Sequence, residues 1–470
     1  MKKQLLTFLT ILSVFAMNAQ VTLVKDINDG TGNSLPSELT LFNNMLYFGA
    51  DDATGTNSPG SVDLGKEFWA TDGTTGGTVF IKDLRTGSAS SSPSFFFNYN
   101  GSLYFSANTG SGNVLHVTDG TESGTTATGG GFMFNPLELN GLIYYIDTTD
   151  LNGLYEFNGT TQVKVANVGT EDVNFIGAAF TALNNKILGY GFTATDDPTV
   201  GRELYEYNPA TDTYILIKDI TGDATDSGIS NFVVLGSEVY FEALDGIWKT
   251  DGTEGGTVAV SAASAATGIN SLFAWNGNLY FEGDTGTSGD QLWKYDPIND
   301  TLTNVSNITG GTNNDHDPSD YAILDTYLYY AGEVADDGLQ YLFRTNGTIS
   351  ERISSAVFDV DDLAVLNGKL YFEGDDGATG NELYSFDPTT LSVGSNVSEI
   401  INVFPNPASD HIMVSKSLIN APYSIYESTG KLVKEGIINS EKIQLNLTSG
   451  LYLVKIKTEN SMVTKKIIVK

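Results

Sequence analysis

Carboxylates are the side chains of this sequence whose types and spacing could do chemistry. Three glutamates, Glu242, Glu282 and Glu373, each follow directly after an apolar-aromatic triplet of residues. Hydrolysis of a glycosidic bond requires a pair of carboxyl groups. The three glutamates are therefore candidate catalytic residues of a carbohydrate-active hydrolase. The alternative interpretation is a structural rim made by equivalent positions of neighbouring repeats.

A second set of carboxylates gathers in loops of variable length. Calcium prefers oxygen ligands, and acids at short spacing can supply several of them. No loop follows the ligand order of an EF-hand. The alternative is that these acids mark solvated hairpin tips. The calcium candidates are Asp51, Asp52, Asp284, Asp290, Asp375 and Asp376.

Composition excludes several other kinds of chemistry. The chain has no cysteine, which excludes disulfides, thiolate metal sites and cysteine nucleophiles. Its 57 acidic and 24 basic residues give a net charge of −33, which argues against nucleic acid as a partner because phosphates need a basic face. Of the 3 histidines, only His316, in an acidic loop, is a candidate metal ligand. The simpler interpretation of His316 is a solvated loop residue.

Two short patterns alternate through the middle of the chain, about 46 residues apart. The first is an apolar-aromatic triplet, as in Leu46-Tyr47-Phe48, and the second has the form E-L-W-x-T-D-G-T. Counting one degenerate triplet at residues 187–189, each pattern occurs eight times. Repeats of 40–50 residues with several strands each are typical of a β-propeller. The aromatic slot of the second pattern is filled by Trp69, His116, Tyr155, Tyr205, Trp248, Trp293, Phe343 and Tyr384.

The local chemistry of both patterns favours blades of four strands. A triplet that is apolar at successive positions indicates a strand covered on both faces, as in a blade between two neighbours. Asp-Gly pairs such as Asp72-Gly73 are strong hairpin signals. Residues 22–27 (TLVKDI) resemble a fourth strand without the three before it. We predict that they close the ring in the last blade, so that no sheet edge is left open. Eight blades are predicted, with seven as the alternative.

On these motifs the array over residues 21–396 resembles the ELWxxDGT repeat family of large secreted bacterial proteins. Several copies lack the full D-G-T. The resemblance implies the architecture and leaves the activity open.

The first 20 residues predict an export signal. Lys2 and Lys3 precede an apolar core of 12 residues, Leu5 to Ala16, and small or polar residues follow. A membrane span needs ~20 apolar residues, so this segment fits a removable signal peptide better than an anchor. No later stretch approaches that length, and we expect no transmembrane segment.

The last seventy residues form a different module. Residues 21–400 carry 13 basic and 52 acidic residues, whereas residues 401–470 carry 9 lysines and 5 acids. Alternating apolar positions separated by Ser-Gly and Thr-Gly turns predict a small antiparallel β-sandwich. The domains are therefore a signal peptide at 1–20, a propeller at 21–396, a linker at 397–401 and the tail module at 402–470.

The tail resembles the type A C-terminal sorting domain of the type IX secretion system of the Bacteroidetes. The motifs that carry the resemblance are the P-N-P entry, the T-G-K-L-V hairpin, the S-G-L-Y-L-V-K-I strand and the basic K-K-I-I-V-K end, in that order. The resemblance implies two partners, an outer-membrane translocon and a sorting peptidase that removes the tail. Its motif residues here are Pro405, Asn406, Pro407, Gly430, Lys431, Gly450, Tyr452, Lys465 and Lys466.

Together these features predict an all-β protein that is exported through the periplasm to the outer-membrane surface or the extracellular space. The leading hypothesis for its activity is non-enzymatic binding of an extracellular glycan or protein through the propeller loops, with calcium as a possible cofactor. The alternative is the secreted hydrolase with carboxylates near the propeller channel.

Overall fold

The computed structural model describes residues 21–147, 153–165, 173–196, 198–286, 289–308, 315–334, 338–391, 403–414, 418–427, 431–457 and 462–470. The chain divides into two compact units, Met1–Leu391 and Ser392–Lys470, and each is described by itself. The predicted signal peptide and the predicted linker lie outside the described residues. No helix of the described residues is long and apolar enough to cross a membrane.

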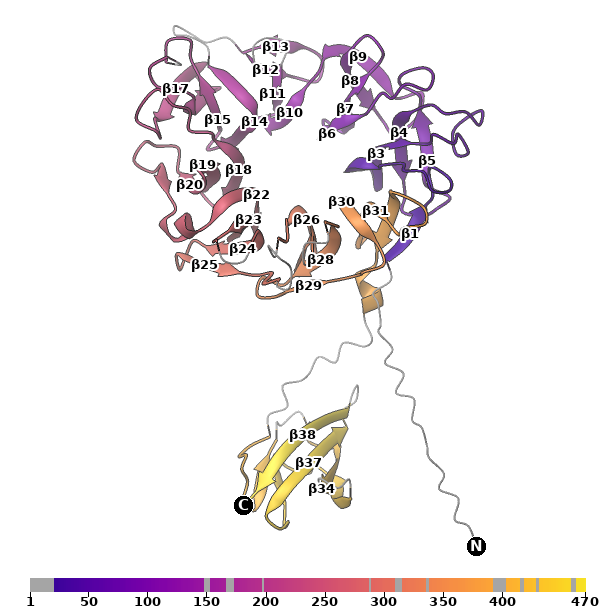
Figure 1. Cartoon of the computed structure of the whole chain (residues 1–470), viewed down its shortest axis with the longest axis vertical. Helices are drawn as coiled ribbons and strands as arrows, with labels where there is room; N and C mark the ends of the chain where they lie inside the picture. The colour runs from indigo at the N-terminus through magenta and orange to yellow at the C-terminus, as the bar shows by residue number, and fades with distance from the viewer. Residues whose placement is uncertain are drawn as a thin grey trace. The chain divides into compact units, whose positions relative to one another are not determined.

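The first unit consists of four-stranded antiparallel sheets, named here blades 1 to 8, which stand around a common axis (Figure 1). Blade 1 holds β2 (Ser37–Phe42), β3 (Met45–Asp51), β4 (Lys66–Thr71) and β5 (Val79–Lys82). Blade 2 holds β6 (Ser94–Tyr99), β7 (Ser102–Asn108), β8 (Asn113–Thr118) and β9 (Thr126–Gly131). Blade 3 holds β10 (Phe134–Leu139), β11 (Leu142–Asp147), β12 (Gly153–Phe157) and β13 (Gln162–Lys164). Blade 4 holds β14 (Asn174–Leu183), β15 (Lys186–Phe192), β16 (Glu203–Asn208) and β17 (Thr213–Lys218).

The remaining blades follow the same order, and the first strand of each blade lies nearest the axis (Figure 1). Blade 5 holds β18 (Ser230–Leu235), β19 (Glu238–Ala243), β20 (Gly246–Thr250) and β21 (Val258–Ala259), followed by the short 3-10 helix η1 (Ser261–Ala265). Blade 6 holds β22 (Thr267–Trp275), β23 (Asn278–Asp284), β24 (Gln291–Asp296) and β25 (Thr301–Asn304). Blade 7 holds β26 (Ser319–Leu324), β27 (Tyr327–Gly332), β28 (Tyr341–Thr345) and β29 (Ser350–Arg352).

Blade 8 joins the two ends of the propeller. It holds β30 (Phe358–Leu366), β31 (Lys369–Asp375) and β32 (Glu382–Phe386), before the 3-10 helix η2 (Pro388–Leu391). Its fourth strand is β1 (Val21–Lys25), which pairs antiparallel with β32. The predicted closure by the N-terminal segment is therefore confirmed, as is the all-β propeller. Within the described residues the blades number eight.

The continuous apolar triplet is explained by the way the blades share their cores. In blade 1, Leu46 and Phe48 pack in a cluster with blade 8, whereas Tyr47 packs in a cluster with blade 2. Successive residues of a strand point to opposite faces, so both faces of the strand are buried between neighbours. Each of the eight joints between blades contains such a cluster among the described residues.

The antiparallel order gives the propeller two different ends. The starts of the first strands, the loops between second and third strands and the connections between blades all lie at one end, which we call the loop face. The other end, the turn face, carries the T-D-G-T turns. In the first of these turns, Asp72 Oδ1 accepts hydrogen bonds from the Thr74 amide (2.8 Å) and the Thr74 hydroxyl (2.7 Å). The same bonds recur at Asp119 and Asp251.

Glycine in these turns is required by the neighbouring blade as well as by the backbone. Gly120 has φ +97°, and a Cβ atom there would lie 2.2 Å from the hydroxyl oxygen of Tyr47 in blade 1. Gly73 has the same relation to Tyr371 of blade 8, at 2.1 Å. The tyrosine of the triplet and the glycine of the turn therefore fix the contact between successive blades.

The second unit has its own core and two sheets. One sheet has the order β35 (Leu432–Ile437), β34 (Pro422–Glu427), β37 (Gly450–Lys457) and β38 (Met462–Val469). The other pairs β33 (His411–Met413) with β36 (Lys442–Gln444). Buried residues of both sheets, among them Ile412, Ile443 and Val454, form one cluster. This arrangement is the small antiparallel β-sandwich that the sequence predicts.

The Gly120→Ala substitution is expected to lower the melting temperature by several degrees. The new methyl group would clash with Tyr47, and alanine disfavours a positive φ. Gly101→Ala is the matched control, because Gly101 has φ +77° and open space around its Cβ position. Thermal unfolding of both variants checks the prediction. Equal losses for the two would show that the contact between blades contributes nothing beyond backbone strain.

Candidate functional site on the loop face

The glutamate of the E-L-W pattern has a structural role. Glu67 is fully buried, and its carboxylate accepts hydrogen bonds from the Leu84 amide (2.7 Å), the Ser91 amide (2.9 Å) and the Ser91 hydroxyl (2.7 Å). These donors belong to the connection that leads into blade 2. Glu382 holds the Ile27 and Asn28 amides in the same way, and so fixes the segment that follows β1. The glutamate of this pattern therefore ties the connections between blades.

A β-bulge begins the first strand of each blade, on the loop face. In blade 1, Ser37 pairs with Gly49 and Thr40 with Tyr47, so one extra residue stands in β2, and Glu38 has φ +61°. Such bulges aim their side chains toward the next blade: Glu38 Oε2 accepts the Phe95 amide at 2.8 Å. Equivalent residues with positive φ are Phe95, Asn135, Asn231, Ser271, Asp320 and Asp362.

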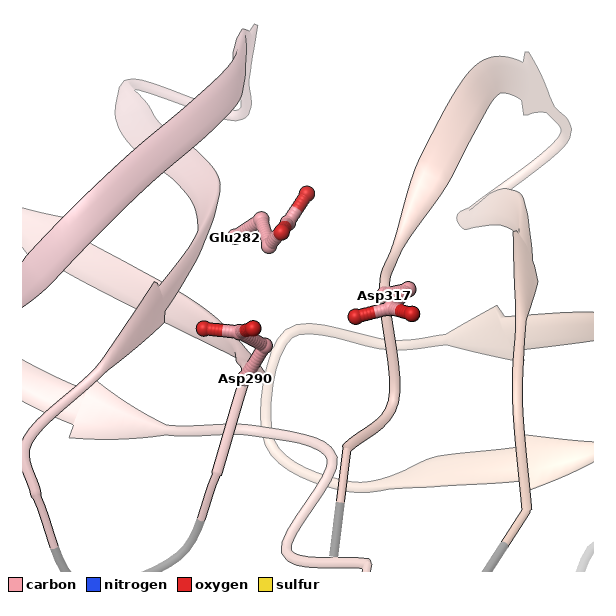
Figure 2. Close-up of side chains that lie close together, drawn as sticks. All are labelled: Glu282, Asp290 and Asp317. Atoms are coloured by element: carbon pink, nitrogen blue, oxygen red, sulfur yellow. The ribbon is translucent and has the colours of Figure 1, made fainter. Parts of the chain in front are cut away.

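Three carboxylates of blades 6 and 7 converge on the loop face. Glu282 of β23, Asp290 just before β24 and Asp317 just before β26 each place one oxygen within 4.8 Å of the other two. Figure 2 shows Asp317 facing Glu282 and Asp290 from the neighbouring segment. We call this set the axial triad. It brings together one predicted catalytic residue, one predicted calcium ligand and one acid of the Asp315-His316-Asp317 loop.

His316 anchors the loop that carries Asp317. Its side chain is completely buried, with Nδ1 2.6 Å from the Glu333 carbonyl and Nε2 3.0 Å from the Tyr330 hydroxyl. Burial lowers the pKa of His316 to about 4, so the imidazole is neutral. Interpreting His316 as a solvated loop residue is therefore wrong. In other blades the equivalent buried position is held by serine, as in Ser34 and Ser91. The acids on both sides of His316 make this position look like part of a solvated loop in the sequence.

Burial and like charges act together on the triad. Burial, and after it the charges of the nearby Asp290, Asp317 and Asp315 carboxylates, raise the pKa of Glu282 to about 7. Burial also raises the pKa of Asp290 and of Asp317, and the charge of Asp315 acts in the same direction on both. A group of carboxyls that ionises with difficulty is suited to hold either a proton or a hard cation.

A second group of carboxylates lies in blade 8, on β30 and β31. Asp361, Asp362 and Glu373 also bring one oxygen each within 4.8 Å of the others. Glu373 is buried and accepts a hydrogen bond from Asn381 Nδ2 (2.8 Å). Burial raises the pKa of Glu373 to about 7. Glu373 and Glu282 hold the same repeat position, and both face an acid of another strand.

Glu242, the third predicted catalytic glutamate, lies in neither group. Its Oε2 accepts hydrogen bonds from the Ser230 hydroxyl (2.6 Å) and from Asn231 Nδ2 (3.0 Å). Both donors belong to β18, so the carboxylate ties β18 to β19 within blade 5.

Four of the other calcium candidates accept hydrogen bonds within local turns. Asp52 is buried and accepts the Asn57 amide (2.6 Å) and the Thr54 hydroxyl (2.9 Å). Asp284 and Asp375, which hold the same repeat position, accept the amides of Gly286 and Gly377. Asp376 accepts the Ala378 and Thr379 amides.

Asp51 is the remaining calcium candidate, and it is half-buried. Burial raises its pKa, and the charge of Asp63 adds to the effect. Of the six predicted calcium ligands, only Asp290 therefore lies in a group of converging carboxylates formed by residues that the structure describes.

In the second unit the P-N-P entry is tied to the last strand. Asn406 donates from Nδ2 to the Lys466 carbonyl (2.9 Å) and accepts the Ile468 amide on Oδ1 (2.9 Å), so its side chain pairs like a strand residue. Tyr452 is buried, and its hydroxyl donates to the Thr448 carbonyl (2.8 Å). Pro405, Pro407, Lys431, Gly450 and Lys466 are exposed, Lys465 is half-buried, and Gly430 lies outside the described residues.

Residues 402–470 match the family model whose description is "Secretion system C-terminal sorting domain". The tail is a sorting domain. A sorting domain of the type IX system indicates export to the cell surface or the extracellular space. No curated protein matches the chain.

Solved structures similar to this chain include three at low identity, one of which is a β-propeller domain. PorZ, a surface component of the type IX secretion system of Porphyromonas gingivalis, is 14% identical, with 91% of this chain and 64% of that chain covered and a TM-score of 0.41. This chain therefore spans less than two thirds of PorZ. An oligogalacturonate lyase of Vibrio parahaemolyticus is 12% identical (76% and 98% covered, TM-score 0.42). The β-propeller domain of the Trilobed protease of Pyrococcus furiosus is 10% identical (64% and 95% covered, TM-score 0.40).

Sequence reasoning missed most of the acids that the fold gathers, among them Asp317, Asp320, Asp361 and Asp362. Aligning the repeats on the proline-serine pair before the first strand would have found two of them. Pro36-Ser37, Pro93-Ser94 and Pro318-Ser319 hold equivalent places, so Asp317 precedes the pair and Asp320 follows it.

The pKa values of the buried glutamates predict how stability depends on pH. Burial raises the pKa of Glu67, Glu282, Glu373 and Glu382 from 4.5 to about 7. The folded state then binds protons more tightly than the unfolded state, so stability falls as the pH rises from about 4.5 through 7. In EDTA we expect a lower melting temperature at pH 8 than at pH 5.5, with a smaller difference for Glu282→Gln. A melting temperature that rises over this interval would contradict the prediction.

Proposed function

We propose that this protein is a non-enzymatic binding module of the cell surface or extracellular space, exported by the type IX secretion system, whose ligand binds to the loop face. One observation carries the proposal. The acids and hydroxyls that repeat among the blades serve structural hydrogen bonds, as Glu67 and Asp72 do. The residues that differ between blades gather on the loop face, where Glu38, Phe95 and Asp320 hold one repeat position. Variation on a rigid frame is typical of binding surfaces.

The propeller repeats are proposed to belong to the ELWxxDGT family. The partners of the sorting domain are proposed to be the outer-membrane translocon and the sorting peptidase of the type IX system. The exposed Pro405, Pro407, Lys431, Gly450 and Lys466 are the residues that these partners could reach. Asn406 and Tyr452 instead keep the domain in shape through the bonds described above.

Calcium is the proposed cofactor, and the axial triad is its proposed site. Calcium takes six to eight oxygen ligands at about 2.3–2.6 Å, so the oxygens of one site lie within about 5 Å of one another. The oxygens of Glu282, Asp290 and Asp317 meet this condition, and water would complete the shell. A bound cation would also relieve the mutual repulsion that opposes ionisation of the three groups.

The alternative, a secreted carbohydrate-active hydrolase, rests on the pKa of Glu282. A carboxyl with a pKa of about 7 can act as general acid beside a second, ionised carboxylate. The separation within the triad, up to 4.8 Å, is close to the ~5 Å of retaining glycosidases. In that mechanism Glu282 would protonate the leaving oxygen, and Asp290 or Asp317 would attack the sugar.

Millimolar calcium is expected to raise the melting temperature by several degrees, and EDTA should reverse the rise. Asp317→Asn should abolish the shift. Asp284→Asn should retain it, because Asp284 bonds to the Gly286 amide outside the triad. Thermal unfolding with and without calcium checks this, and an equal shift in Asp317→Asn would refute the site. Polysaccharide hydrolysis that is lost in Glu282→Gln would favour the hydrolase over the binding module.

Export is tested in a host with a type IX system. Deletion of residues 402–470 should leave the propeller in the periplasm, because the segment matched by the sorting-domain family is removed. Cell fractionation of the deletion and of the full chain gives the result. Secretion of the deletion at the normal level would contradict the assigned export route.

A further inference from the structure

A pocket on the loop face lies between blades 8, 1 and 2. Its volume is about 840 Å³, which is within the range of small-ligand sites. Its wall is formed by the starts of several strands, by the connection between β5 and β6, and by Asn108 at the end of β7, Phe132 between β9 and β10, and Asp361 and Asp362 of β30. None of its lining residues belongs to the axial triad of blades 6 and 7, so it is a second candidate binding site on the loop face.

The pocket contains an aromatic residue where the other described bulges have none. Phe95 has φ +53°, a conformation that favours small polar residues and is unusual for a bulky side chain. The other described bulges hold Glu, Asn, Ser or Asp. Glu38 of the preceding blade accepts the Phe95 amide at 2.8 Å and so holds the backbone in place. A strained position occupied by an aromatic ring at a pocket wall points to a role for the ring.

A second ring orients Phe95 in the pocket. Phe132 also lines the pocket, and its ring centroid lies 5.3 Å from that of Phe95 with the planes at 82°. Both side chains are half-buried. This edge-to-face pair presents an apolar surface of limited size in an otherwise polar wall.

Hydroxyl and amide groups make up most of the rest of the wall. Ser90, Ser92, Asn108 and Asn113 line it, and Asn113 is exposed. Such groups both donate and accept hydrogen bonds, which suits a ligand rich in hydroxyls. A lipid or an apolar peptide could not use the hydrogen-bonding capacity that these groups retain.

The charges of the pocket are mixed. Lys66 and Arg85 line it together with Glu38, Asp361 and Asp362. Burial lowers the pKa of Lys66, and the surrounding carboxylates oppose that effect. The acidic propeller repels polyanions over a longer range, because residues 21–400 hold 52 acids against 13 basic residues.

We propose that this pocket binds a neutral oligosaccharide, with the C–H face of one sugar ring on Phe95 and its hydroxyls bonded to the serines and asparagines. The inference deepens the proposed function, on which it rests, by naming the ligand class and the place of contact. It requires no catalytic step.

The test uses the purified full chain and arrayed cello-, xylo-, manno-, laminari- and chito-oligosaccharides of three to six residues. Polygalacturonate is the anionic comparison. We expect at least one neutral series to bind, and Phe95→Asn to weaken that binding at least ten-fold. Asparagine already holds the bulge in blades 3 and 5, so Phe95→Asn should fold as well as the parent. Asn113→Ala should also weaken binding. Ser271→Asn, which places the same new residue at the equivalent bulge position of blade 6, should not weaken it.

Two outcomes would overturn the pocket assignment. One is no binding of any neutral oligosaccharide at millimolar concentration, including the case in which only polygalacturonate binds. The other is binding that Phe95→Asn and Asn113→Ala leave unchanged. Both leave the proposed function standing, since a ligand could bind elsewhere on the loop face. Cleavage of an arrayed glycan that is lost in Glu282→Gln would instead overturn the non-enzymatic function.

Discussion

The propeller depends on a buried side-chain oxygen that, in blades 1, 4, 6 and 8, ties the connection leaving a blade to that blade. Glu67, fully buried at the start of β4, satisfies two amides and one hydroxyl of the segment that enters blade 2. Amides buried without partners are costly, so this bond fixes the path of the chain between blades. Gln291 does the same in blade 6, where its Oε1 accepts the Ile308 amide and the Ser306 hydroxyl. The bulges that follow are placed by these connections.

The turn face and the loop face consequently differ in how far their residues can vary from blade to blade. On the turn face, Tyr371 and Tyr47 contact the turn glycines of the next blade, Gly73 and Gly120, where a Cβ atom would lie 2.1 Å and 2.2 Å from the tyrosine hydroxyl. On the loop face, the connections are fixed at their ends, and the residues between them differ in charge, size and chemistry. The axial triad and the pocket beside Phe95 both arise from such differences. The sorting domain has a separate core, consistent with a module that addresses the protein for export.

Much of this fold could be predicted from the sequence, because its signals are local and repeated. The triplets, the Asp-Gly turns and the unpaired strand at residues 22–27 indicate blades, turns and closure without any structure. The site was harder to predict. Asp317 meets Glu282 only because His316 is buried beneath the loop, and two flanking acids make that histidine look solvated. The spacing of residues along one strand likewise cannot show which acids of a neighbouring blade lie close to that strand.

The most direct test of this account compares thermal unfolding of Glu67→Ala and Glu282→Ala. The account predicts that Glu67→Ala loses several kcal/mol of stability, about 1–3 kcal/mol for each buried donor left without a partner. Glu67→Gln should lose less, because its Oε1 can still accept the Leu84 amide and the Ser91 hydroxyl, as Gln291 Oε1 accepts an amide and a hydroxyl in blade 6, whereas its NH2 group cannot accept the Ser91 amide. Glu282→Ala, measured in EDTA, should keep or raise the melting temperature. If Glu282→Ala unfolded earlier than Glu67→Ala, the division between structural and loop-face acids would be contradicted.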